Sequence, residues 1–291
     1  MKKSLAAIFL VLVMTILTVY PVHGEGDKDS TQKKPDLDVP YEPTSYGIAE
    51  AMLSMAEVNS KDLVYDLGCG DGRILVMAAK ERGARGVGVD LDPERVAEAK
   101  KNAKAAGVSR LVRFYEQNLF DTDISQATAV MLYLWPEVNL RLRPKLLSDL
   151  RPGTRVVSHS HTMKDWEPNA KRRVESHNLY LFIIPANVTG VWEWADQDGS
   201  RTSLEVKQRF QKIEGSIAAG GLKVRITKPN LQGDALSFSA KGVGPQKDRV
   251  ILFSGRVKGN VIEGKMTDPS GSTIGPWKAT RDSATIRSIA E

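Results

Sequence analysis

The chain has 291 residues, of which 41% are hydrophobic and 26% charged, a balance typical of soluble globular proteins with one large domain or two moderate ones. Its net charge is +6, and because Lys2 and Lys3 supply two of those charges, the remainder is too mildly basic to indicate a nucleic-acid-binding protein. The single cysteine, Cys69, excludes an intramolecular disulfide framework.

The first residues have the three-part pattern of a secretory signal. Lys2 and Lys3 precede an apolar run at residues 5–20, and Val22 and Gly24 are small residues at the −3 and −1 positions of a cleavage site after Gly24. We expect residues 1–24 to be a signal peptide that exports the protein to the periplasm or another extracytoplasmic space. The alternative is an uncleaved anchor that keeps the protein near a membrane. Residues 25–38 are charged and aperiodic, which predicts a flexible tether.

Between residues 39 and 185, helical and strand patterns alternate. Thr44 or Ser45 can cap a first helix, residues 73–82 suit a second, Asp92 and Pro93 begin a third that ends at Gly107, and residues 138–150 form a fourth. The expected strands are residues 63–67, 86–90, 111–115, 129–134, 154–158, 172–175 and 179–184. This alternation predicts an α/β fold, a Rossmann-like, doubly wound, seven-stranded sheet with helices on both faces.

After Pro185 the pattern changes to short alternating runs separated by Gly, Asn and Asp. We expect a small all-β barrel or sandwich of roughly eight antiparallel strands over residues 186–283, followed by a tail at residues 284–291. Gly259 and Asn260 suit a hairpin turn. The tryptophans at positions 192, 194 and 277 can form a ligand mouth, but core packing is the better interpretation.

The sequence VYDLGCGDGR, residues 64–73, runs from the first strand through a glycine-rich loop into a helix. Gly68, Gly70 and Gly72 allow the backbone to approach a ligand closely. Arg73 stands where a dinucleotide-binding loop needs a small residue, so the pattern favours a zwitterionic ligand whose ammonium Asp66 can hold. Asp90 ends the second strand, where a carboxylate can accept both hydroxyls of a ribose.

These motifs resemble the class I, seven-strand S-adenosylmethionine-dependent methyltransferases. The resemblance is greatest to the protein-lysine methyltransferase branch that includes the enzyme acting on the c subunit of mitochondrial ATP synthase. The matching elements are VPYEPT (residues 39–44), DLGCGDGR (66–73) and NLF (118–120), and the resemblance extends over about residues 39–168. It leaves the C-terminal β-domain uncovered.

The resemblance implies S-adenosyl-L-methionine as the cofactor and a lysine side chain of a protein as the acceptor. It implies that Asp66, Gly68, Gly70 and Gly72 line the methionine end, and that Asp90 contacts the ribose. Asn118, where the branch usually has Asp, would contact the adenine side through its side-chain carbonyl. Tyr41 and Thr44 would close over the cofactor beside the substrate channel.

The acceptor side offers weaker candidates. Tyr133 and Trp135 follow the fourth strand and can line an amine channel, with core packing an equal alternative; Tyr133 is the one candidate for a catalytic residue. His159 and His161 lack a visible third ligand, so we predict no metal site and keep a substrate-facing role open. Residues 171–173 (KRR) suit a solvated edge strand.

Two alternative functions stay open at this stage. One is an exported, non-catalytic binding module that keeps an adenosyl-ligand site and recognises a ligand through its β-domain. The other is a methyltransferase for small molecules. The sequence predicts no nucleic-acid partner and does not indicate an oligomeric state.

Overall fold

The computed structural model describes residues 41–196, 199–241 and 249–290. The predicted signal peptide or anchor (residues 1–24) and tether (25–38) lie outside the described residues. Within the described part, no helix has both the length and the apolar character needed to cross a membrane.

The N-terminal part contains a seven-stranded mixed sheet, which confirms the predicted fold class. In space the strands are ordered β3-β2-β1-β4-β5-β7-β6. The first five run parallel to their neighbours, whereas β7 is antiparallel to both β5 and β6. The strands are β1 (Leu63–Leu67), β2 (Arg85–Asp90), β3 (Val112–Glu116), β4 (Ala129–Leu132), β5 (Arg155–His159), β6 (Ala170–Val174) and β7 (His177–Ile183).

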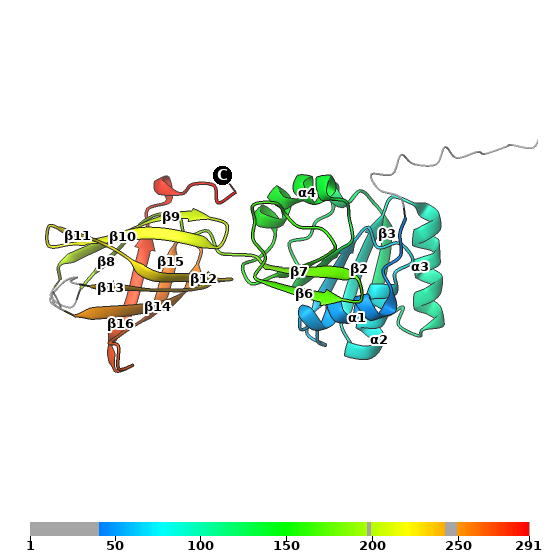
Figure 1. Cartoon of the computed structure of the whole chain (residues 1–291), viewed down its shortest axis with the longest axis horizontal. Coiled ribbons are helices and arrows are strands. Elements are labelled where there is room, and N and C mark those ends of the chain that lie inside the picture. The colour runs from blue at the N-terminus through cyan, green and yellow to red at the C-terminus, as the bar shows by residue number, and fades with distance from the viewer. Residues whose placement is uncertain (1–40, 197–198, 242–248, 291) are drawn as a thin grey trace, which may run out of the picture. The chain divides into compact units, whose positions relative to one another are not determined.

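Helices cover both faces of this sheet, as predicted (Figure 1). They are α1 (Tyr46–Met55), α2 (Arg73–Arg82), α3 (Pro93–Ala105) and α4 (Pro136–Asp149), with a 3-10 turn η1 (Leu119–Asp121). Apolar residues of α1, α2 and α3 share one buried cluster, and those of α4 belong to another. The predicted caps are confirmed, because the Ser45 hydroxyl accepts a hydrogen bond from the Ile48 amide and the Asp92 carboxylate accepts one from the Glu94 amide.

The C-terminal part forms a second, antiparallel sheet of nine strands, one more than the rough prediction. Their order is β11-β10-β9-β8-β16-β15-β14-β13-β12. The edge strands β11 and β12 are consecutive in the chain with only Ile226 between them, so the sheet nearly closes into a barrel. The strands are β8 (Gly190–Ala195), β9 (Arg201–Arg209), β10 (Lys212–Ala219), β11 (Leu222–Arg225), β12 (Thr227–Gln232), β13 (Ala235–Lys241), β14 (Val250–Lys258), β15 (Val261–Thr267) and β16 (Thr273–Arg281), followed by a 3-10 turn η2 (Ser283–Thr285).

Aromatic side chains fill the interior of this second sheet. Trp192, Trp194 and Trp277 are all buried in one apolar cluster, so core packing, not a ligand mouth, is the correct interpretation. The Trp277 ring meets those of Phe238 and Phe253 edge to face, at centroid distances of 5.5 and 5.2 Å. Gly259 and Asn260 connect β14 to β15, as predicted for a hairpin.

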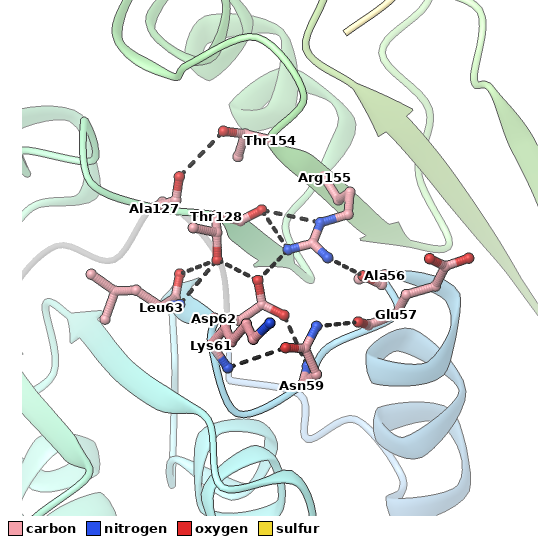
Figure 2. A network of polar contacts seen from close by, with 10 residues as sticks. All are labelled: Ala56, Glu57, Asn59, Lys61, Asp62, Leu63, Ala127, Thr128, Thr154 and Arg155. Carbon is pink, nitrogen blue, oxygen red and sulfur yellow. Dashed lines mark hydrogen bonds and ion pairs between the residues drawn. The ribbon is translucent and has the colours of Figure 1, made fainter.

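A polar network fixes the amino end of the first sheet (Figure 2). The Asp62 carboxylate forms an ion pair with Arg155 and accepts hydrogen bonds from the Thr128 hydroxyl (2.7 Å) and the Asn59 amide (2.8 Å). Arg155 also donates to the carbonyl oxygens of Ala56 (2.9 Å) and Thr128 (3.0 Å). Burial opposes ionisation of Asp62, but these hydrogen bonds outweigh it and lower its pKa. The network therefore joins the end of α1 to the starts of β1, β4 and β5.

We predict that Asp62→Ala destabilises the first sheet, because it leaves the Arg155 guanidinium without its carboxylate. The side chain of Asp62 is 7% exposed and that of Arg155 is 22% exposed. The expected loss is about 2 kcal/mol, which lowers the melting temperature by roughly 4–8 °C in calorimetry. The control is Asp149→Ala, because Asp149 is 34% exposed in its pair with Lys145 and should change stability by less than about 0.5 kcal/mol. Equal melting temperatures for both variants would contradict the prediction.

Candidate functional site

The glycine loop after β1 is built on the end of β2. The amides of Gly68 and Cys69 both donate to the Val89 carbonyl oxygen, at 2.9 and 3.0 Å. The Asp90 carboxylate accepts hydrogen bonds from the Gly70 amide (2.8 Å) and the Asp92 amide (3.0 Å). Gly68, Gly70 and Gly72 have φ values of +85°, +52° and +75°, a region that favours glycine. The loop thus curves back across the carboxyl edge of the sheet.

A cleft lies at this edge, and the empty space within it, counting its open side, is about 880 Å³. Of the residues predicted for the site, seven line it: Tyr41, Thr44, Asp66, Gly68, Gly70, Asp90 and Tyr133. The sequence analysis assigned no site role to the other lining residues. These are Glu42, Pro43, Cys69, Asp71, Arg73, Ile74, Val89, Leu91, Asp92, Arg95, Gln117, Leu119 and Leu134.

Two predicted site residues, Gly72 and Asn118, are not among the residues that line the cleft. A Cβ at Gly72 would lie 2.7 Å from the Phe114 ring and 2.8 Å from the Ala99 Cβ, so this glycine permits α2 and α3 to pack on the sheet. The Asn118 side-chain oxygen accepts a hydrogen bond from the Phe120 amide (2.9 Å) and caps η1. Gln117 and Leu119, on either side of Asn118, do line the cleft. The local sequence alone does not show which of these three neighbours faces it.

Asp66 lies at the floor of the cleft and is 3% exposed. Burial raises its pKa well above the usual value, and the nearby carboxylates of Asp90 and Asp71 raise it further. A ligand that brings a positive charge to this point would relieve both effects. The residues present therefore fit an amino acid-like ligand with an ammonium group, which the methionine part of S-adenosylmethionine carries.

The segment of residues 41–44, which we call the strap, crosses the glycine loop. The Tyr41 ring lies over Gly70, where an added Cβ would be 2.4 Å from a ring carbon, and the Arg95 guanidinium stacks on the ring at 4.9 Å. The Arg73 side chain donates to both carboxylate oxygens of Asp71 and to the Thr44 carbonyl oxygen (2.9 Å). Arg73 thus holds the strap and the loop together.

Tyr133, at the end of β4, lies against a buried histidine. Its ring stacks on His159 at a centroid distance of 3.8 Å, and His159 Nδ1 is 3.2 Å from the Thr44 hydroxyl. Burial, with His177 and His161 nearby, lowers the pKa of His159 to about 4, so its ring is neutral at physiological pH. Burial and a hydrogen bond to the Glu42 carboxylate raise the pKa of Tyr133 to about 12. Trp135, the other aromatic candidate, is 53% exposed and does not line the cleft.

His159 and His161, the pair considered in the sequence analysis for a metal or a substrate contact, do not continue one strand face at the end of β5. Ser160, between them, has a φ of +64°, which breaks the strand alternation that would place both side chains on one face. The imidazole ring that lies next to His159 is that of His177, at a centroid distance of 4.8 Å. In the part of the chain that the structure describes, no three His, Cys, Asp or Glu side chains are grouped to hold a metal ion.

Comparison with known proteins identifies the same region. Residues 66–170 match the family model of the ANTKMT methyltransferase domain. A protein-lysine N-methyltransferase of Saccharolobus islandicus (strain REY15A) is 44% identical over 151 residues, which are 50% of this chain and 94% of that protein. The adenine nucleotide translocase lysine N-methyltransferase of Mus musculus is 36% identical over 135 residues, 46% of this chain and 58% of that protein.

A solved structure extends the comparison to a bound ligand. The crystal structure of an RNA methyltransferase from Salinibacter ruber in complex with S-adenosyl-L-homocysteine is 48% identical, with a TM-score of 0.50, and the match covers 50% of this chain and 96% of that one. The family model ends at residue 170, before the second sheet begins.

The parallel sheet, the glycine loop and the cleft at its carboxyl edge define a class I methyltransferase that uses S-adenosylmethionine. The chain belongs to the same family of S-adenosylmethionine-dependent methyltransferases as the protein of Saccharolobus islandicus, and this confirms the family that its motifs predicted. These relationships support an enzyme over a non-catalytic binding module.

We predict that Gly72→Ala is more destabilising than Gly107→Ala. Both glycines have nearly the same φ, +75° and +74°, but a Cβ at Gly107 meets nothing within 4 Å. Gly107→Ala therefore costs only the backbone strain, about 1 kcal/mol, whereas Gly72→Ala adds roughly 1–3 kcal/mol of overpacking against Phe114. Calorimetric melting temperatures measure the difference, and equal shifts would show that Gly72 has no packing role.

We predict that Asp66→Asn stabilises the ligand-free protein and weakens binding of S-adenosylhomocysteine. Folding raises the pKa of Asp66. The contribution of Asp66 to stability is therefore greatest below the pKa that it has in the unfolded chain, and it is lost as pH rises through the pKa that it has in the folded protein. At neutral pH the variant should thus melt higher, yet bind at least about tenfold more weakly because a charge-assisted contact is lost. For the wild type, affinity should fall as pH is lowered through the raised pKa. Weaker binding without stabilisation would contradict the electrostatic explanation.

Proposed function

We propose that this methyltransferase modifies the ε-amino group of lysine in a protein. The relatives named above include a protein-lysine N-methyltransferase that the chain matches over 94% of its length and an adenine nucleotide translocase lysine N-methyltransferase. The observation that carries the proposal is the excess of acidic side chains around the cleft: Glu42, Asp66, Asp71, Asp90 and Asp92 line it, against two arginines. Such a lining attracts a cationic lysine side chain.

An RNA acceptor is the second candidate, because the Salinibacter ruber relative is named an RNA methyltransferase. The charges at the cleft argue against it. Arg73 is hydrogen-bonded to Asp71, and Arg95 is paired with Glu98, so neither cation presents an unpaired charge to a phosphate. Carboxylates near the cleft would repel the backbone of a nucleic acid, whose binding depends on basic residues.

We propose cofactor contacts for the residues that line the cleft. Asp66 would hold the ammonium group, Gly68 and Gly70 would admit the methionine part, and Asp90 would accept the ribose hydroxyls while it keeps its bonds to Gly70 and Asp92. Tyr41 and Thr44 of the strap would cover the ligand. For Asn118 we keep an adenine-side contact as a proposal, made through the amide nitrogen or the remaining lone pair of its oxygen.

The bound cofactor supplies a methyl group on a cationic sulfur, which a nucleophile displaces without acid–base help to the leaving group. What remains for the protein is to align the acceptor, exclude water and let the acceptor lose its proton. Tyr133 stays protonated at physiological pH because its pKa is about 12, so it orients the acceptor and is not the base.

The test is transfer of radiolabelled methyl from S-adenosylmethionine, with the full chain, to a lysine-rich peptide and to total RNA. We expect label in the peptide and none in RNA. The Asp90→Ala variant should incorporate at least about tenfold less label into the peptide, because it lacks a ribose contact worth roughly 1.4 kcal/mol or more. Asp123→Ala, an exposed acidic residue that does not line the cleft, is the control. Label in RNA alone would overturn the lysine proposal, and S-adenosylhomocysteine that bound Asp90→Ala as tightly as wild type would overturn the assigned site.

A further inference from the structure

The strap carries a carboxylate at the open side of the cleft. Of the five carboxylates that line the cleft in the described part of the chain, Glu42 is the exposed one, whereas Asp66, Asp71 and Asp92 are buried and Asp90 is half-buried. The other four carboxylates already have structural roles or form the floor of the cleft. Asp71 is paired with Arg73, Asp90 holds two backbone amides, Asp92 caps α3, and Asp66 forms the floor.

Glu42 interacts with Tyr133, and the strap next to it is held through Thr44. The Glu42 carboxylate and the Tyr133 hydroxyl both line the cleft and interact, which raises the pKa of Tyr133, and the Tyr133 ring is stacked on the buried His159. Two residues further along the strap, the Thr44 hydroxyl meets the same His159 ring and the Thr44 carbonyl accepts from Arg73. The strap and the end of β4 therefore place two oxygen atoms, a carboxylate and a phenol, together at the cleft.

We propose that Glu42 and Tyr133 form the site that receives the ammonium end of the acceptor, so that Glu42 selects a primary alkylamine over neutral or anionic nucleophiles. This inference rests on the proposed lysine methylation. A lysine side chain arrives at neutral pH as a cation with three N–H donors. The Glu42 carboxylate can accept one of them, and a lone pair of the Tyr133 oxygen can accept another.

The reaction also needs the ammonium to lose a proton, because the protonated nitrogen has no lone pair. A carboxylate is too weak a base to remove a proton from an alkylammonium in water. The ammonium therefore transfers its proton to water at the open side of the cleft, and the role of Glu42 is to bind the cation. For this reason loss of Glu42 should affect KM for the acceptor more than kcat.

The direct test uses n-butylamine as a mimic of the lysine side chain and n-butanol as its neutral counterpart. Binding of each to the full-length protein saturated with S-adenosylhomocysteine is followed by saturation-transfer NMR. We expect wild type to bind n-butylamine and to prefer it over n-butanol, and Glu42→Gln to lose this preference. Glu137→Gln is the matched control, because Glu137 is exposed in the first turn of α4, close in sequence to Tyr133, but does not line the cleft.

Kinetics with a lysine peptide give the second measure. Glu42→Gln should raise KM about fivefold to tenfold, with kcat changed less than about threefold, as for loss of a single charge-assisted hydrogen bond. Tyr133→Phe, which keeps the stacked ring, should raise KM less. If S-adenosylhomocysteine binds and Glu42→Gln still prefers n-butylamine as wild type does, this inference is wrong while methyl transfer stands. If S-adenosylhomocysteine does not bind to well-folded wild type, the proposed function fails and the inference with it.

Discussion

The geometry of the cleft depends on the carboxylate of Asp90. By accepting hydrogen bonds from the amides of Gly70 and Asp92, it ties the loop after β1 to the loop after β2. The glycine loop can then follow a left-handed path that leaves the floor residue Asp66 accessible from one side. A shorter or neutral side chain at position 90 would remove an acceptor from a buried amide, so the ligand site and the loop that forms it share one residue.

A second set of contacts joins the strap to distant parts of the sheet. Tyr41 lies on the glycine loop, Thr44 meets His159 at the end of β5, and Arg73 bonds to the Thr44 carbonyl. His159 stays neutral because of its burial and its histidine neighbours, so the Tyr133 ring stacks on an uncharged partner. Near Tyr133 the strap is thus held by packed, uncharged rings together with Arg73, and Glu42 and Asp66 are the groups that we propose to bind cations. This arrangement suits a site that must bind cations at two points.

Local signals in the sequence predicted the fold well. Glycine spacing, the Asp92–Pro93 start of α3 and the apolar strand runs are each encoded within a few residues, and all appear in the structure. Side-chain direction was harder to predict, because it depends on partners far along the chain. Gly72 faces Phe114 and not the cleft, Asn118 caps η1, and Glu42 gains significance only through Tyr133, which lies about ninety residues away. The sequence alone contains no signal that brings these pairs together.

The two edges of the first sheet have different roles. At the amino edge, Asp62 and Arg155 satisfy each other and the nearby backbone groups in a network that joins four elements (Figure 2). At the carboxyl edge, Asp66 is buried beside two other carboxylates, an arrangement that is unfavourable until a cation arrives. Parallel strands bring their carboxyl ends together, so loops from different strands can create such a site. The stability that the network provides at one edge can offset the unfavourable burial of the Asp66 carboxylate at the other. A ligand that carries positive charge relieves this unfavourable burial, so the site favours such a ligand.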